Sequence, residues 1–257
     1  MKLEAMYSVA LMVAAMVLLV ISVPVYASEM DDRIESSARQ SYVFKTYLKD
    51  DDIKIQSKDA VVTLTGIVAN EFHKSLAQET LAGLPGVISV DNRLELKGAA
   101  PTANSDAWLR DKVKATLLFH RSVSAIKSEV DVKDGIVTLR GEAASQAQKD
   151  LTTEYAKDVD GVRDVKNEMT VSKTSDKTSD TLGEMIDDAS ITAQVKMALL
   201  SHRSTSAVTT KVTTNNGVVT LSGKAKNAAE KDLVSKLVQD IKGVKSVKNQ
   251  MTIGESK

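Results

Sequence analysis

The strongest constraint on the fold of this 257-residue chain is a pattern that occurs three times in register. The segment Val62–Gly66 recurs with small changes as Val137–Gly141 and Val219–Gly223. Another glycine follows 20 residues after each segment, and an asparagine follows six residues later. The recurring positions are Gly66, Gly86, Asn92, Gly141, Gly161, Asn167, Gly223, Gly243 and Asn249. Residues 106–171 and 188–253 are identical at 30 of 66 positions without a gap. Such self-similarity indicates a repeated structural unit.

The spacing predicts three domains of about 70 residues. We place them at residues 28–98 (repeat 1), 104–172 (repeat 2) and 185–254 (repeat 3), with a linker at 173–184. The segments between the repeats are rich in Gly, Pro, Ser and Thr, which is typical of solvated linkers. Units of this size can fold alone. The sequence therefore favours three separate cores over one merged interior.

Each repeat reads as helix, strand, strand, helix, strand. Apolar residues recur every four positions in the first helix. They are Ile34, Ala38 and Tyr42 in repeat 1, Leu109, Val113 and Leu117 in repeat 2, and Ile191, Val195 and Leu199 in repeat 3. The core stripe that we expect for the second helix is Ala147, Leu151, Tyr155 and Val159 in repeat 2 and Ala229, Leu233, Leu237 and Ile241 in repeat 3. The order of elements predicts an α+β fold of three tandem αββαβ domains. Each has a three-stranded mixed sheet with both helices on one face.

The two central strands should form a hairpin. Asp134–Gly135 and Asn216–Gly217 are strong hairpin signals, because these residues tolerate a positive φ. Repeat 1 has Asp59–Ala60 at this place, so its turn should be strained or of another type. The recurring glycines are expected to end a strand and to cap the second helix. The recurring asparagines alternate onto the apolar side of the last strand, where a buried amide must find partners, so we interpret each as a clasp to neighbouring backbone.

These features together resemble the BON domain of bacterial envelope proteins, such as osmotically inducible and nodulation-related ones. The shared pattern is an amphipathic helix, a hairpin reading G-[IV]-V-T-L-x-G, a second helix, and then G-V-x-x-V-x-N. It covers essentially all of the chain after residue 27, three times over, whereas relatives usually carry two copies. The resemblance implies an αββαβ fold without catalytic machinery. It also implies association with phospholipid or with unfolded or assembling envelope proteins.

The first 27 residues have the pattern of a secretory signal peptide. Lys2 lies near the start, an apolar run covers Val9 to Val23, and small residues lie at Val25 and Ala27. We expect cleavage after Ala27 and a periplasmic location. The alternative is an uncleaved membrane anchor, for which the run is short, since a spanning helix needs about 20 apolar residues.

No arrangement of residues indicates catalysis or a cofactor. Cysteine is absent, and the histidines are His73, His120 and His202. The last two occupy equivalent positions, but a zinc site needs three or four converging ligands. We therefore interpret both as side chains that interact with the carbonyls at the end of their own helix. Neither a phosphate-binding glycine motif nor a Ser-His-acid triad is present. The sequence predicts a non-enzymatic protein without metal or cofactor.

Charge is distributed unequally along a chain whose 34 basic and 34 acidic residues balance. Residues 28–98 carry 9 basic and 12 acidic side chains, residues 99–172 carry 11 and 12, and residues 173–257 carry 13 and 9. The overall balance gives no reason to expect a nucleic-acid partner. In repeat 3, Lys242, Lys245 and Lys248 cluster where the second helix meets the last strand. Each lysine near an anionic bilayer contributes about 1 kcal/mol, although a solvated surface without a partner also explains them.

Four aromatic residues are further candidates for contacts with a membrane or a partner: Phe44, Tyr47, Trp108 and Phe119. Exposed aromatic side chains mark interfaces, either between repeats or with lipid. Trp108 is expected to be partly exposed and to pack between domains.

Two hypotheses follow. In the first, the protein binds anionic phospholipid or envelope assemblies weakly through its tandem domains, which raise avidity when they engage together. In the second, it is a periplasmic chaperone for unfolded exported or outer-membrane proteins. The second requires exposed apolar surface near Phe44, Tyr47 and Phe119, whereas the first does not.

Overall fold

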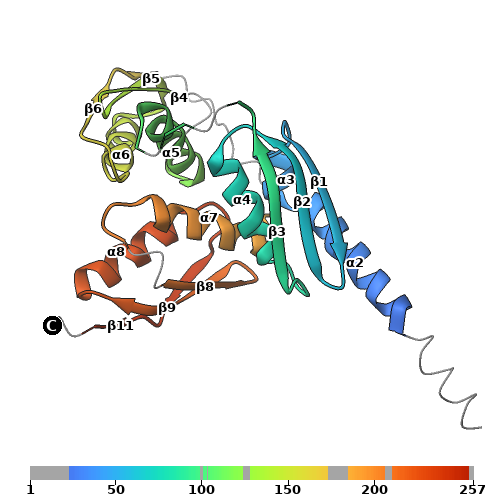
Figure 1. The fold of residues 1–257 in the computed structure, drawn as a ribbon. Helices are drawn as coiled ribbons and strands as arrows, with labels where there is room; N and C mark the ends of the chain where they lie inside the picture. The colour runs from blue at the N-terminus through green and yellow to red at the C-terminus, as the bar shows by residue number, and fades with distance from the viewer. Residues whose placement is uncertain are drawn as a thin grey trace, which may run out of the picture.

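The structure is a computed structural model that describes residues 23–98, 101–102, 104–123, 128–172, 185–205 and 210–254. It confirms the predicted α+β fold of three repeats (Figure 1). In each repeat the second strand lies at the centre of a mixed sheet, antiparallel to the first strand and parallel to the last. The helix between the last two strands makes the crossover that a parallel pair requires.

Repeat 1 differs from the others in its first helix. Its elements are α2 (Val23–Gln40), α3 (Tyr42–Thr46), β1 (Asp52–Lys58), β2 (Val61–Val68), α4 (Glu71–Ala82) and β3 (Ser89–Leu96). The helix breaks at Ser41, whose side chain caps α3 by accepting from the Phe44 amide. Ile34 and Ala38 of the predicted stripe are buried, but the break leaves Tyr42 half-buried on α3.

The predicted signal peptide lies mostly outside the described residues, which begin at Val23. Helix α2 runs through the predicted cleavage position after Ala27. Within the described residues, every helix is too short or too polar to cross a bilayer.

Repeats 2 and 3 match each other element by element. Repeat 2 contains α5 (Asp106–Phe119), β4 (Ser128–Lys133), β5 (Ile136–Ala143), α6 (Gln146–Lys157), β6 (Asp164–Asn167) and β7 (Thr170–Val171). Repeat 3 contains α7 (Asp188–Ser201), β8 (Thr210–Asn215), β9 (Val218–Ala225), α8 (Ala228–Gln239), β10 (Ser246–Asn249) and β11 (Thr252–Ile253). The two short final strands of each repeat lie along the same central strand, so they act as one interrupted strand.

One aspartate of the first helix holds the hairpin turn in each repeat. Asp106 accepts hydrogen bonds from the Asp134 and Gly135 amides at 2.8 and 2.9 Å. Asp31 and Asp188 make the equivalent bonds in repeats 1 and 3. The amides of Gly135 and Asp134 hold the pKa of Asp106 below its usual value. This turn contact was not predicted from the sequence.

The hairpin of repeat 1 is strained, as the sequence predicted. Asp59 and Ala60 have φ values of 53° and 62°, the conformation that Asn-Gly and Asp-Gly adopt in the other two repeats. An alanine in the left-handed region costs about 1–2 kcal/mol. The contacts from Asp31 hold this turn in place.

The recurring glycines do not end strands or cap helices, so that prediction is wrong. Gly66, Gly141 and Gly223 lie inside their central strands at φ of 120°, 121° and 127°. A Cβ on Gly66 would lie 2.0 Å from the Asp52 carbonyl oxygen of the paired strand. The later set, Gly86, Gly161 and Gly243, lies three residues beyond each helix cap, where the chain turns against the first helix.

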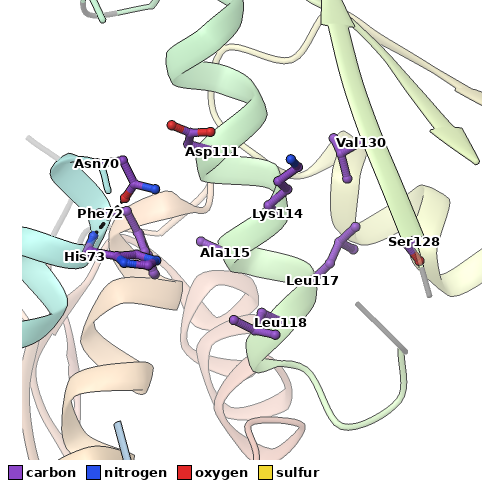
Figure 2. Close-up of a pocket in the computed structure, with 10 residues that line it drawn as sticks. All are labelled: Asn70, Phe72, His73, Asp111, Lys114, Ala115, Leu117, Leu118, Ser128 and Val130. Carbon is purple, nitrogen blue, oxygen red and sulfur yellow. Dashed lines mark hydrogen bonds between the residues drawn. The ribbon is translucent and has the colours of Figure 1, made fainter. Parts of the chain in front are cut away.

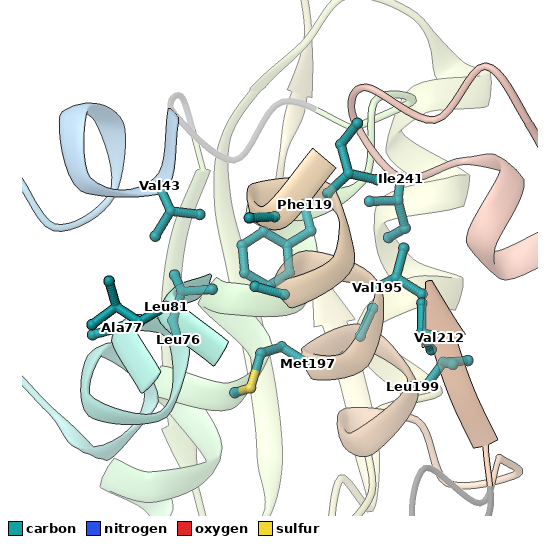
Figure 3. Packing of buried hydrophobic residues seen from close by; sticks show 14 of the residues in the cluster. Val43, Leu76, Ala77, Leu81, Phe119, Val195, Met197, Leu199, Val212 and Ile241 are labelled. Atoms are coloured by element: carbon teal, nitrogen blue, oxygen red, sulfur yellow. The ribbon is translucent and has the colours of Figure 1, made fainter. Parts of the chain in front are cut away.

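The expectation of three separate cores is also wrong. Repeat 2 keeps a core of its own, but the apolar interiors of repeats 1 and 3 form one continuous cluster (Figure 3). In Figure 3, Leu76 and Leu81 of α4 lie beside Met197 of α7. Polar contacts accompany them, because Asp187 and Ser190 of repeat 3 accept hydrogen bonds from the amides of Tyr42 and Val43. Residues at every angle of α7 are buried, as expected for a helix enclosed by its neighbours.

The second helices bury only part of the predicted stripe. In α6 the buried residues are Thr152 and Ala156, whereas Leu151 is 41% exposed. In α8 they are Glu230, Val234, Leu237 and Val238, so Leu237 is buried as predicted. Val159 and Ile241, the last members of the predicted stripe, are also buried, Val159 in the core of repeat 2 and Ile241 in the cluster shared by repeats 1 and 3.

Candidate functional site

Repeats 2 and 3 meet at a junction that uses the same residues from both sides. His120 of repeat 2 forms an antiparallel bridge with Ile241 of repeat 3, and His202 of repeat 3 forms one with Val159 of repeat 2. His202 lies 82 positions after His120, and Ile241 lies 82 positions after Val159, so the two bridges join equivalent residues. Such reciprocity is the signature of an isologous, two-fold interface.

The backbone and the arginines repeat this exchange. The Arg121 amide donates to the Asp240 carbonyl oxygen and the Arg203 amide to that of Asp158, both at 2.9 Å. The Arg121 guanidinium also donates to the carbonyls of Gln239, Ile241 and Val244. These carbonyls lie at the end of α8, the second helix of repeat 3, or just after it. The prediction that His and Arg interact with the end of their own helix is therefore wrong.

His120 lies at the buried centre of this junction, with an exposed fraction of 0%. Its ring stacks on Tyr155 at a centroid distance of 3.8 Å, and its Nδ1 lies 3.3 Å from Oδ2 of Asp240. Tyr155 and Ser122 donate to the same carboxylate at 2.6 and 2.5 Å. Burial acts to raise the pKa of Asp240, but the hydrogen bonds from His120, Ser122 and Tyr155 outweigh it and lower that pKa. Burial and the bond to Asp240 raise the pKa of Tyr155.

The opposite half of the junction is looser. Nε2 of His202 lies 3.6 Å from Oδ2 of Asp158, and Nδ1 of His202 accepts from the Ser204 amide at 3.1 Å. Burial lowers the pKa of His202; Asp158 opposes that shift, and Arg203 and His120 reinforce it. Leu237 replaces Tyr155 in repeat 3, so this half lacks the stacked ring and its bond to the carboxylate.

The described residues do not support a metal site, since they contain no group of three or more His, Asp or Glu side chains that could hold an ion. His120 and His202 contribute to contacts between repeats. The third histidine, His73, pairs with Asp51 at 2.5 Å at the start of α4. Asp51 also accepts a hydrogen bond from the Ala69 amide. In repeats 2 and 3 the side chains of Gln148 and Glu230 accept the equivalent bond, from the amides of Ala144 and Lys226.

A shallow pocket of about 210 Å³ lies between repeats 1 and 2 (Figure 2). Phe72 and His73 of repeat 1 line one side, and Asp111, Lys114 and Leu118 of α5 line another. The charges are of both signs and no buried polar atom lacks a partner there, so the pocket indicates no particular ligand.

The aromatic candidates do not form an external surface. Phe119 is fully buried between repeats 1 and 3, as Figure 3 shows, and its ring lies 5.5 Å from Tyr47 and 5.4 Å from Phe72. Tyr47 is 9% exposed and Phe44 is half-buried against the same cluster. These residues thus lie at an interface between repeats, which is one of the two alternatives left open by the sequence, and their burial contradicts the other alternative, a membrane contact.

Trp108 is half-buried, as the sequence suggested, but it packs on the core of its own repeat and not between domains. Nζ of Lys112 lies 4.5 Å from the centre of its ring.

The recurring asparagines clasp the last strand to the second helix. Nδ2 of Asn167 donates to the Lys149 carbonyl and to Oγ1 of Thr153 at 2.9 and 2.8 Å. Its Oδ1 accepts from the Met169 amide. Asn92 and Asn249 make the equivalent bonds. All three amides are fully used within the fold, so they have a structural role here.

The three candidate lysines of repeat 3 do not lie on one patch. Lys242 is half-buried at the junction, where its amide donates to the Phe119 carbonyl. Lys245 is exposed beside Gly217 at the hairpin turn. Lys248 is exposed on β10, and it faces away from the core because its neighbours Val247 and Asn249 alternate inward.

Comparison with known families agrees with this architecture. The model of the BON domain matches residues 30–98, 105–173 and 187–255, one match for each repeat. The chain belongs to the BON-domain family. Its BON repeats account for all the sheets described above, and the reciprocal junction joins the second BON repeat to the third.

Individual relatives share about two copies of the domain. Osmotically-inducible protein Y of Escherichia coli is 32% identical over 143 residues, which are 54% of this chain and 71% of that protein. A 21 kDa hemolysin of Actinobacillus pleuropneumoniae is 25% identical over 158 residues, 62% of this chain and 72% of the hemolysin. Among solved structures, CdsD, a structural protein of the type III secretion system of Chlamydia trachomatis, aligns at 18% identity and a TM-score of 0.24, over 86% of this chain and 91% of that one. A score this low carries no further argument.

Proposed function

We propose that this protein is a non-enzymatic periplasmic envelope protein that associates with anionic phospholipid through its third BON repeat. The supporting observation is the charge of that part of the chain. Residues 173–257 carry 13 basic and 9 acidic side chains, whereas residues 28–98 carry 9 and 12. Lysines near an anionic leaflet bind with about 1 kcal/mol each. Docking should accordingly be weak and sensitive to salt.

The names of the relatives are consistent with an envelope role under stress. One is described as osmotically inducible and another as a hemolysin. The predicted signal peptide supports export. The packing of repeats 1 and 3 into one body favours a single docking surface over independent engagement of three domains, so the proposal does not depend on avidity.

The chaperone hypothesis is less well supported. It required exposed apolar surface near Phe44, Tyr47 and Phe119, and two of these side chains are buried. The lipid hypothesis requires only the basic character of repeat 3.

Co-sedimentation with vesicles tests the proposal. The chain that begins at Ser28 is mixed with vesicles of phosphatidylglycerol and phosphatidylcholine at low salt, and with vesicles of phosphatidylcholine alone. We expect binding only to the first, and loss of that binding as the salt concentration rises. Absence of binding to both, with circular dichroism showing a folded protein, would contradict the proposal. Suppression of aggregation of an unfolded outer-membrane protein would favour the chaperone hypothesis instead.

A further inference from the structure

The sheet of repeat 3 has one face that no helix covers. Val219, Leu221 and Ala225 of β9 point into the core, so residues 218, 220, 222 and 224 point to the other side. The register places Lys211 of β8 beside Ser222 and Lys248 of β10 beside Thr220. Figure 1 shows α7 and α8 on the inner side of this sheet, toward the rest of the molecule. We call the outer side the open face of repeat 3.

The open face carries a lysine from each of three adjacent strands: Lys211 on β8, Lys224 on β9 and Lys248 on β10. All three are exposed. The remaining side chains of the face are mostly hydroxyl groups and amides, namely Thr213, Asn215, Thr220, Ser222, Ser246, Gln250 and Thr252. Within the described strands of repeat 3, the face contains no Asp or Glu.

The same face of repeat 2 carries an excess of acidic residues. Five acidic residues lie on it, namely Glu129, Asp131, Glu142, Asp164 and Glu168, beside three basic residues, Lys133, Arg140 and Lys166. The equivalent positions of repeat 3, at an offset of 82, are Lys211, Thr213, Lys224, Ser246 and Gln250. Every acid has been replaced, two of them by lysine, although the two repeats are identical at 30 of 66 positions over residues 106–171 and 188–253. The fold does not require this change, because repeat 2 forms the same sheet with the acids in place.

The open face of repeat 1 is balanced. Lys54, Lys58 and Arg93 share it with Asp52, Asp91 and Glu95. Arg93 and Asp91 pair at 2.6 Å, so part of this charge is neutralised within the face. The face of repeat 3 is thus the one among the three described sheets with positive charge and no acid.

We propose that the open face of the repeat 3 sheet is the surface that docks on anionic phospholipid. This inference rests on the proposed function and assigns it to specific residues. Adjacent strands lie about 4.8 Å apart, and the register places Lys248 beside residue 220, Lys211 beside residue 222, and Lys224 two residues further along β9, so the three lysines form a staggered basic row across the face. A layer of phosphate head groups complements such a surface in charge, and the hydroxyl groups can donate to phosphate oxygens. The acid-free background removes the repulsion that the same face of repeat 2 would meet.

The test gives repeat 3 the residues that repeat 2 already has. The double variant Lys211→Glu, Lys224→Glu introduces the equivalents of Glu129 and Glu142 into the full mature chain. The control is Lys157→Glu, Lys236→Glu, which changes the net charge equally at exposed positions in the last turns of α6 and α8. Binding to vesicles of phosphatidylglycerol and phosphatidylcholine is measured at low salt for both variants and for the unchanged protein.

We expect the face variant to bind at least about 30-fold more weakly, since each lysine contributes about a factor of five, and the control to change much less. Equal binding by the face variant and the control would overturn the assignment of the face while leaving the proposed function intact. Failure of the unchanged protein to bind would reject the proposed function and this inference together. If the face variant lost binding to heparin but kept binding to vesicles, the face would bind soluble polyanions, and its assignment to lipid would be wrong.

Discussion

Repeats 2 and 3 have the same fold and nearly half their aligned residues in common, yet they occupy different positions in the molecule. Helix α5 of repeat 2 buries one side fully, and Asp111 and Lys112 on its other side are only half-buried. Helix α7 of repeat 3 has Ala193 and Gln194 at these positions, and both are fully buried. The difference arises because α4 of repeat 1 covers the outer side of α7. A helix without a polar face therefore marks the central repeat of the assembly.

The largest expected effect concerns the two cores. Leu199→Ala and Leu117→Ala remove equivalent buried side chains, and each should cost about 2–5 kcal/mol. Hydrogen exchange should show lost protection in repeats 1 and 3 for the first variant, since they share one interior, and mainly in repeat 2 for the second. If Leu199→Ala left the amides of β1 to β3 as protected as before, the shared interior would be refuted.

The next largest expected difference is in the stability that each half of the junction contributes. Asp240→Ala leaves His120, Ser122 and Tyr155 without their acceptor, which should cost about 2 kcal/mol. Asp158→Ala, at the equivalent position, should cost less than about 1 kcal/mol, because that carboxylate is 47% exposed and contacts His202 at 3.6 Å. Denaturant unfolding of both variants measures the difference. Equal losses would mean that the stacked Tyr155 does not distinguish the halves.

Acid should weaken the junction on the repeat 3 side. Burial lowers the pKa of His202 in the folded protein, so the unfolded chain binds a proton first as the pH falls below about 6.5. The stability contributed by the neutral ring is present above that pH and is lost as the pH falls toward the folded pKa. Asp158 favours protonation of this ring, whereas Arg203 and His120 oppose it. Hydrogen exchange of the Arg203 amide between pH 7.5 and 5.5 measures the effect after correction for intrinsic exchange. His202→Gln should remove the pH dependence, and an unchanged dependence in that variant would assign it elsewhere.

The smallest expected difference concerns the hairpin turns. Gly135→Ala and Gly217→Ala both place a side chain at positive φ, at a cost of about 1–2 kcal/mol. The new Cβ would lie 2.8 Å from the Arg163 side chain in repeat 2, which can move. In repeat 3 it would lie 3.1 Å from the Gly243 carbonyl oxygen, which cannot move freely. Thermal unfolding should therefore show the larger loss for Gly217→Ala. The reverse order would show that backbone contact does not limit this turn.

The sequence predicted the fold because its signals are local. The stripe Ile191, Val195 and Leu199 and the turn Asn216–Gly217 specify elements whose order permits few topologies. Contacts between repeats were not predictable in the same way. His120 and Asp240 are 120 residues apart, and only their recurrence at an offset of 82 hinted at a reciprocal contact.

The open face of repeat 3 could have been found from the sequence. Alternation along residues 218–225 places Lys224 on the outer side of the sheet. Comparison with residues 136–143 shows that the equivalent residue of repeat 2 is Glu142. Closeness along the chain instead groups Lys242, Lys245 and Lys248. The structure separates them because the chain passes from the junction, around the hairpin turn, and onto the sheet within those seven residues.

The packing of repeats 1 and 3 into one body can be tested most directly by a zero-length cross-link. Nζ of Lys196 on α7 lies 2.7 Å from Oε2 of Glu79 on α4, and Lys112 and Asp160 form an ion pair within repeat 2 at 3.8 Å. A carbodiimide applied to the dilute, unmodified protein should join both pairs within one chain, as identified by mass spectrometry. Formation of the Lys112–Asp160 amide without any Glu79–Lys196 amide would show that repeats 1 and 3 are separate in solution.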